Sequence, residues 1–281
     1  MKFNPYRLIL SLALIIAGLV IANYLVFKKI NKQPQPKPPA ELPPARPAQK
    51  PPPPDSAVKP AQPKISIVID DLGTDLTVAD TLYRISPKIT LAILPFQSFS
   101  QKIARLAQQR GQTTLLHLPL EPHDELGKFP KPSYMLLLEE NNAIMLRQLR
   151  DSLCNVPGIA GVNNHMGSRF TEDNSHMNLI LEEIKQRGLF FLDSRTTPRS
   201  VGYDVACQMG IPALKRDVFL DNELEAAAIA AQLEKLITIA RKKGQAIGIG
   251  HPHPQTLAEL AKFVARLPNA GVELVELPGL L

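Results

Sequence analysis

The sequence ISIVIDD at residues 65–71 is the stretch that decides the fold. Its run of β-branched residues, Ile65–Ile69, is typical of a strand buried on both faces of a parallel sheet. A stretch with helical character follows near residues 75–85. The segment therefore predicts the first strand of an α/β fold, with two carboxylates, Asp70 and Asp71, at the carboxyl end of that strand.

The same strand–helix pattern repeats along residues 64–281, with a less regular unit at 200–220. Further strands are predicted at 90–94, 113–117, 159–163, 189–193, 245–249 and 272–277, and helices near 99–110, 141–153, 175–187, 222–243 and 255–266. Repeated alternation of this kind indicates a parallel sheet. We expect an α/β distorted (β/α) barrel of seven or eight parallel strands, with an open doubly wound sheet as the alternative.

The positive charge of the chain is concentrated at its amino-terminal end. The 281 residues include 32 Lys and Arg against 26 Asp and Glu, for a net charge of +6. Residues 1–63 hold nine of the basic and two of the acidic side chains, so residues 64–281 are close to neutral. This distribution argues against nucleic acid as a partner of the main body.

A short segment, residues 1–7, precedes an uncharged apolar run at 8–27. This run is long enough to span a bilayer, so it predicts a transmembrane anchor, with a cleaved signal peptide as the alternative. Counting basic residues around it weakly favours a cytoplasmic body. Residues 28–63 form a Pro-rich linker, with 13 prolines at positions 33–63, which predicts a stiff, extended spacer. The domain that carries the function is expected at 64–281.

Acids and histidines follow several of the predicted strands. They are Asp70, Asp71, His117, His165, Asp193 and His251. Each taken alone has an ordinary explanation, because an Asp after a strand often caps a helix and a single His is often a core residue. Together they lie where parallel folds place their active sites. Two imidazoles and a carboxylate suit Zn²⁺ or a similar divalent ion, a second carboxylate can deprotonate water, and a further His can protonate a leaving group.

Five motifs, in order, resemble those of the divergent polysaccharide deacetylases, distant relatives of the NodB-like carbohydrate esterases. The resemblance covers nearly all of 64–281, and its motifs are Ile69-Asp70-Asp71, His117–Pro122, Asn163–Thr171, Asp193–Thr197 and Gly248–Pro252. It implies a distorted (β/α) barrel, a metal-dependent hydrolase site, and a membrane-anchored or secreted protein of the bacterial envelope.

The resemblance also implies roles for individual residues. Asp71 corresponds to the metal-binding aspartate and Asp70 to the catalytic base, and His251 corresponds to the general acid. Better-studied relatives take both metal histidines from one His-x-x-x-His segment, which this chain lacks. We therefore expect His117 and His165, from successive strands, to be the two histidine ligands.

Four further residues are expected to support this site. Asp193 is predicted to orient His251, and Arg169 or Arg195 to keep Asp70 ionised. Asn164 and Arg195 are candidate substrate-binding residues.

The function that the resemblance implies is removal of N-acetyl groups from amino sugars of a cell-wall polysaccharide or peptidoglycan. The enzyme is expected in the inner membrane with its body in the periplasm, or secreted after cleavage. A catalytically inactive glycan-binding or scaffold domain is the alternative. Hydrolysis of another amide or of a phosphate ester is a third interpretation. The chain has no Gly-rich phosphate-binding loop and no Gly-x-Ser-x-Gly motif, which disfavours phosphate-ester and serine-hydrolase chemistry.

Overall fold

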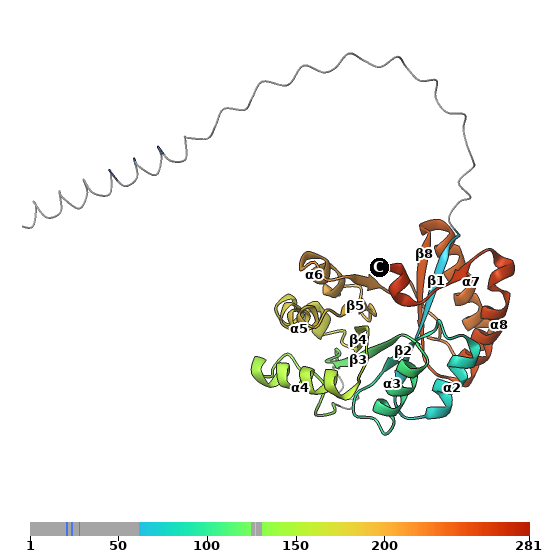
Figure 1. Ribbon diagram of the computed structural model, residues 1–281, viewed down its shortest axis with the longest axis horizontal. Coiled ribbons are helices and arrows are strands. Elements are labelled where there is room, and N and C mark those ends of the chain that lie inside the picture. Colours follow the sequence, from blue (N-terminus) through green and yellow to red (C-terminus); the bar gives the residue numbers. More distant parts are fainter. Residues whose placement is uncertain (1–20, 22–23, 25–27, 29–61, 125–126, 128–130) are drawn as a thin grey trace, which may run out of the picture. The chain divides into compact units, whose positions relative to one another are not determined.

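The computed structural model describes residues 62–124, 127 and 131–281, together with Ile21, Tyr24 and Lys28. Its body contains a nine-stranded parallel sheet with helices packed around the outside (Figure 1). The strands are β1 (Lys64–Leu72), β2 (Thr90–Ile93), β3 (Thr114–Leu120), β4 (Gly161–Met166), β5 (Phe190–Asp193), β6 (Ala213–Lys215), β7 (Val218–Phe219), β8 (Gln245–Gly250) and β9 (Glu273–Leu274). The helices are α2 (Leu76–Ile85), α3 (Ser100–Gln109), α4 (Asn142–Asn155), α5 (Asn174–Gln186), α6 (Gly202–Gln208), α7 (Ala226–Lys243) and α8 (Pro254–Ala270), with short 3-10 helices η1 (Phe170–Glu172) and η2 (Leu277–Leu280).

The predicted alternation of strands and helices is confirmed, with shifts at the ends of elements. The less regular unit at 200–220 forms α6 and the short strands β6 and β7. Strand β3 continues to Leu120, three residues beyond the predicted end. The last predicted strand, 272–277, is reduced to β9, which pairs with the start of β1 before the chain turns into η2.

The sheet curls but does not close into a complete barrel. Its strand order is β6-β5-β4-β3-β2-β1-β8-β7, so β6 and β7 are its two edges, yet only Arg216 and Asp217 separate them in the chain. The backbone N–H of Arg216 donates to the carbonyl of Asp193, and that of Asp217 donates to the carbonyl of Ile247. In a closed barrel, the two edge strands would be joined by a further row of strand–strand hydrogen bonds. Here Arg216 and Asp217 instead connect β5 and β8 through these two hydrogen bonds. The predicted barrel is corrected to a curled half-barrel.

Side chains of the strands alternate between two cores. Ile65, Ile67 and Ile69 of β1 point outward into the large core shared with the helices, whereas Val68 belongs to a smaller core built from strands and η2. This smaller core lies on the concave face and includes Leu115 of β3. Because side chains change face at every residue of a strand, this alternation determines which strand-end residues can reach the interior.

The predicted anchor (8–27) and linker (28–63) lie largely outside the described residues. Of the anchor, only Ile21 and Tyr24 are described, and both are helical. Among all described residues, no helix combines the length and apolar character needed to cross a membrane.

Candidate active site and metal centre

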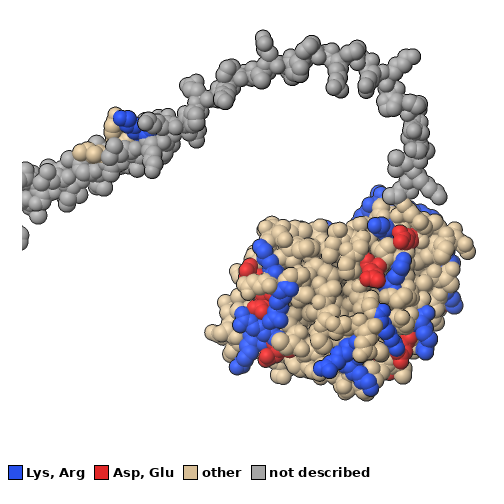
Figure 2. Space-filling view, viewed as in Figure 1, with Lys and Arg blue, Asp and Glu red and all other residues tan. Residues whose placement is uncertain are grey.

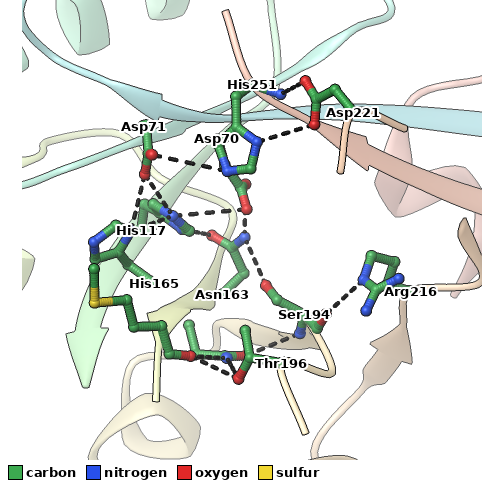
Figure 3. Close-up of polar contacts among 12 residues, drawn as sticks. Asp70, Asp71, His117, Asn163, His165, Ser194, Thr196, Arg216, Asp221 and His251 are labelled. Atoms are coloured by element: carbon green, nitrogen blue, oxygen red, sulfur yellow. Dashed lines mark hydrogen bonds and ion pairs between the residues drawn. The ribbon is translucent and has the colours of Figure 1, made fainter. Parts of the chain in front are cut away.

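A bulge at the end of β1 brings both carboxylates to one place. The pairing with β2 runs from Ile69 opposite Leu91 to Leu72 opposite Ile93, so β1 has one extra residue there. Asp71 adopts a left-handed backbone conformation with φ of 60°. In a regular strand, adjacent side chains would point to opposite faces. Here Asp70 Oδ2 and Asp71 Oδ1 lie 3.6 and 3.1 Å from the same atom, Nε2 of His117 (Figure 3).

His117 and His165 meet Asp71 from the neighbouring strands β3 and β4. The register places His117 opposite Asn163 and Pro119 opposite His165, so the two histidines are on the same face, staggered by two residues. His165 Nδ1 lies 2.9 Å from Asp71 Oδ1 and 3.2 Å from His117 Nε2. The structure therefore brings together the three residues predicted as metal ligands, each with one donor atom aimed at a common point (Figure 3).

These three donor atoms fit a divalent ion. Bonds of about 2.0–2.2 Å to a shared ion hold ligand atoms roughly 3 Å apart, as observed here. Asp71 Oδ1 is buried and accepts no hydrogen bond of good geometry, although both ring nitrogens are close. Burial opposes its ionisation, but the adjacent His117 and His165 lower the pKa of Asp71 well below its ordinary value. A deprotonated oxygen that lacks a hydrogen-bond donor is a group that a cation would satisfy.

Asn163 connects the candidate metal centre to the second carboxylate. Its side-chain amide donates to Asp70 Oδ1 (2.9 Å) and to Ser194 Oγ (3.1 Å), and its Oδ1 lies 3.0 Å from His117 Nδ1. Because ionised Asp70 can only accept, the amide nitrogen faces it and the amide oxygen faces the ring. His117 Nδ1 then carries the proton, which leaves Nε2 free as a ligand. Sequence reasoning missed this residue, although it lies on β4 two residues before His165.

Asp70 is almost completely buried, with 3% of its surface exposed. Burial raises the pKa of Asp70, against the opposing effects of His117 and Asn163. His117, equally buried, has its pKa lowered by burial but raised overall by Asp70 and Asp71. A carboxylate with a raised pKa is a stronger base than an exposed aspartate.

His251 lies on the other side of Asp71 and is held by Asp221. Asp221 Oδ1 lies 3.1 Å from His251 Nδ1, and Asp221 Oδ2 accepts hydrogen bonds from the backbone N–H of His251 (2.6 Å) and from Thr256 Oγ1 (2.8 Å). His251 Nε2 is 3.8 Å from Asp71 Oδ2. Burial opposes protonation of the ring, but Asp221 and Asp71 raise the pKa of His251 overall. The ring thus directs Nε2 toward the candidate metal centre, and its surroundings favour the protonated form.

Comparison with known proteins identifies the family. Residues 67–281 match the family model described as divergent polysaccharide deacetylase. The chain belongs to this family. It is 34% identical over 218 residues to the uncharacterized protein YibQ of Escherichia coli K12, covering 78% of this chain and 67% of YibQ. It is also 34% identical over 213 residues to an uncharacterized protein of Haemophilus influenzae, covering 74% of each chain.

A solved structure agrees with this assignment. The uncharacterized protein ATU2773 of Agrobacterium tumefaciens C58 superimposes with a TM-score of 0.74 at 29% identity, covering 80% of this chain and 92% of that one. The predicted membership of the divergent polysaccharide deacetylase family is confirmed, and with it the curled parallel α/β fold of the body.

In this family member, Asp193 does not orient His251, and that prediction was wrong. Asp193 follows Phe191 on the outer face of β5, where Phe191 belongs to the large core. Its Oδ2 accepts from Ser200 Oγ (2.7 Å) and from the backbone N–H of Tyr203, and its Oδ1 accepts from the N–H of Arg195. Asp193 therefore fixes the loop after β5, and Asp221 takes the predicted role. Asp221 follows the very short strand β7, a position that the strand-end rule would have selected had the strand been recognised.

Neither predicted guanidinium contacts Asp70. Arg169 donates to Glu121 Oε1 at 2.5 Å and lies near Glu139, while Arg195 donates to the carbonyl of Pro198. The side chain that donates a hydrogen bond to Asp70 is instead the Asn163 amide. A neutral donor in that place avoids burying a further charge.

Asn164 is not placed for substrate contact. It is 1% exposed, because it alternates with Asn163 and points to the outer face of β4. Its amide donates to the carbonyl of Met166, and its Oδ1 accepts from the N–H of Ser194. Asn164 thus ties the ends of β4 and β5 together.

His253 adds a donor atom within 4.8 Å of Asp221 and His251. Both oxygens of Asp221 are already occupied by hydrogen bonds to the protein, so the geometry favours the Asp71 cluster as the metal centre.

Proposed function

We propose that the body is a metal-dependent hydrolase that removes N-acetyl groups from amino sugars of a bacterial envelope polysaccharide, such as peptidoglycan. The observation that carries the proposal is the arrangement around Asp71. Its carboxylate and the rings of His117 and His165 provide three donor atoms within 3.2 Å of one another. A buried carboxylate, Asp70, lies on one side and a carboxylate-held imidazole, His251, on the other. The arrangement would provide a base, an ion site and an acid close to one another.

Asp71, His117 and His165 would hold the ion. Two imidazole nitrogens and one carboxylate oxygen form a set of ligand atoms that suits zinc best. When bound, such an ion supplies Lewis acidity, which polarises the acetyl carbonyl and stabilises negative charge on its oxygen. Asn163 fixes the His117 tautomer that leaves Nε2 unprotonated. The chain contributes the remaining chemistry through groups that move protons.

Asp70 accepts the proton of the attacking water, whose oxygen bonds to the acyl carbon. The raised pKa of Asp70 favours this transfer. His251 then donates its Nε2 proton to the amide nitrogen as the C–N bond breaks, so that acetate and a free amine leave. The raised pKa of His251 favours the protonated ring that this step requires. Asp221 stabilises the imidazolium before transfer and retains the ring orientation afterwards.

An apolar cavity of about 230 Å³ adjoins the metal centre. It is lined by His165 and by Leu94, Pro119, Pro132, Tyr134, Met135 and Met166. Since each water of liquid occupies about 30 Å³, the cavity has room for a group of several non-hydrogen atoms. An acetyl methyl group directed into it would leave the carbonyl beside His165 and the sugar toward the solvent.

Acetate release by the full-length chain tests the proposal. Protein stripped with a chelator and reloaded with Zn²⁺ is incubated with peptidoglycan and with N-acetylglucosamine oligomers. We expect acetate release that requires both the metal and Asp70, with Asp70→Asn reducing the rate by at least about 100-fold. Zinc bound at one equivalent with no acetate released from any of these glycans would contradict hydrolysis. Glycan binding under those conditions would favour the inactive, glycan-binding alternative.

The amino-terminal segments support a place in the envelope. The uncharged run at 8–27 has the length of a membrane anchor, and the Pro-rich linker at 28–63 would hold the body away from the bilayer. We expect the full chain to stay with inner membranes after alkaline washing and to be digested by protease added to spheroplasts. Release of the chain into the soluble periplasmic fraction would instead indicate a cleaved signal peptide, and protection from the protease would place the body in the cytoplasm.

A further inference from the structure

Phe96, in the loop after β2, is an exposed aromatic residue held in a strained backbone conformation. Its φ is 59°, in the left-handed region, and it is 44% exposed. A bulky residue other than glycine seldom adopts this conformation, which costs about 1–3 kcal/mol. Burial of the ring does not offset that cost, since much of the ring remains in solvent.

Residues with a strained backbone lie at the carboxyl ends of the strands, where the candidate active site is also located. Among the described residues, those other than glycine with positive φ are Asp71, Phe96, Met166 and Arg195. Every one of them lies at or within three residues of the carboxyl end of a strand. Asp71 is a proposed metal ligand and Met166 lines the apolar cavity, so strain in this fold coincides with the site.

The surrounding structure fixes the loop rather than the ring. The backbone N–H of Phe96 donates to Asn155 Oδ1 at the end of α4 (2.8 Å). Next to it, the N–H of Gln97 donates to Ser100 Oγ, which in turn donates to the carbonyl of Leu94 (2.6 Å). These bonds hold the backbone in place while the ring stays available for a ligand.

Tyr134 continues this surface toward the metal centre. Its ring centroid lies 5.1 Å from that of Phe96, with the planes tilted by 47°, and its hydroxyl accepts a hydrogen bond from Gln97 Nε2 (2.8 Å). Tyr134 also lines the apolar cavity together with His165. The two rings therefore form a continuous aromatic surface that leads from solvent to a proposed metal ligand.

We propose that Phe96 and Tyr134 form a platform on which a pyranose ring of the glycan stacks while a neighbouring acetyl group occupies the cavity. The proposal rests on the proposed function, because it names how that site recognises its substrate. The C–H face of a pyranose ring is apolar and its rim is polar. The apolar face can pack on the two tilted aromatic rings, and the polar rim can hydrogen-bond with the Gln97 amide and the Tyr134 hydroxyl beside them. A stacking surface outside the cavity would make the site prefer oligomers over single sugars.

Phe96→Gly separates a binding role from a structural one. Glycine adopts positive φ without strain, so we expect the melting temperature to stay the same or to rise. Affinity for the N-acetylglucosamine tetramer should fall about fivefold to tenfold. Phe96→Tyr keeps the ring and should retain the affinity. Phe99→Ala is the matched control: Phe99 is a similarly exposed ring in the same loop, at 36%, and its replacement should leave affinity unchanged.

Binding is measured by calorimetry on the Zn²⁺-loaded full chain in an Asp70→Asn background, which removes turnover. Equal affinities of the parent and Phe96→Gly would overturn the platform even if the wild-type chain releases acetate. Loss of affinity in Phe96→Gly alone would support the platform even if no acetate is released. The absence of measurable tetramer binding to the parent chain would also overturn it, whereas the failure of acetate release counts only against the proposed function.

Discussion

Asp221 holds His251 at two points, through the backbone N–H and through Nδ1 of the ring. The two residues are 30 positions apart in the sequence and belong to the ends of different strands, β7 and β8. This double contact fixes both the position of the backbone and the direction of Nε2, which points toward Asp71.

Replacement of Asp221 by Asn should shift the pH dependence of acetate release. Asp221 raises the pKa of His251, so the protonated acid persists to higher pH in the native protein. Removing the charge lowers that pKa, and the alkaline limb of the rate profile should move to lower pH. The rate at the optimum should fall roughly 10- to 100-fold. A rate–pH profile of Asp193→Asn provides the control, because Asp193 faces the outer side of β5. An alkaline limb that stays in place in Asp221→Asn would show that Asp221 does not act through His251.

Replacement of His165 by Ala should weaken zinc binding about 10- to 100-fold, because it removes one of the three donor atoms. Competition with a chromophoric chelator measures this change directly and does not depend on activity. His176→Ala is a suitable control, since His176 pairs with Asp173 at the start of α5. Unchanged zinc affinity in His165→Ala would remove His165 from the ligand set.

Asn163→Ala should destabilise the body and reduce activity together. The change removes the side chain that hydrogen-bonds to the buried Asp70 Oδ1, to His117 Nδ1 and to the Ser194 hydroxyl. Unsatisfied buried groups cost about 1–3 kcal/mol each, so we expect a decrease of at least about 2 kcal/mol in the free energy of unfolding. Denaturation in urea measures this change. Asn178→Ala, on the exposed side of α5, should change stability by less than about 0.5 kcal/mol. Similar stabilities of the two variants would argue against a central role for Asn163.

The stability of the body should depend on pH through Glu172. Burial slightly opposes ionisation, but Arg199, Thr197 and His123 lower its pKa to about 2, against an ordinary value of 4.5. A carboxylate with a depressed pKa stabilises the fold above pH 4.5, and this contribution is lost as the pH falls through about 2.

The melting temperature of the wild type should therefore exceed that of Glu172→Gln at pH 6, and the difference should shrink steadily toward pH 2. The same difference should also be smaller in 1 M salt, because Arg199 is exposed and its pairing with Glu172 is screened. A difference that is constant with pH would mean that the charge of Glu172 contributes nothing.

The sequence by itself determined the order of the elements and the set of residues at the carboxyl rim. Runs such as ISIVI and LFFLD identify buried strands, and the residue types that follow them indicated metal and proton-transfer chemistry. Asp70, Asp71, His117, His165 and His251 lie close together because parallel strands end at the same edge of a sheet.

Only the tertiary structure decided which rim residues face inward. Leu189–Asp193 is apolar at four consecutive positions, so its sequence contains no alternation from which the face of Asp193 could be predicted. The same holds for the adjacent pair Asn163 and Asn164. The side chain of Asn163 points into the candidate site, and that of Asn164 points to the outer face of β4. The bulge that turns Asp71 toward His117 and the two-residue link that places Asp221 beside His251 depend on sheet curvature. That curvature arises from packing among distant strands, and local sequence does not encode it.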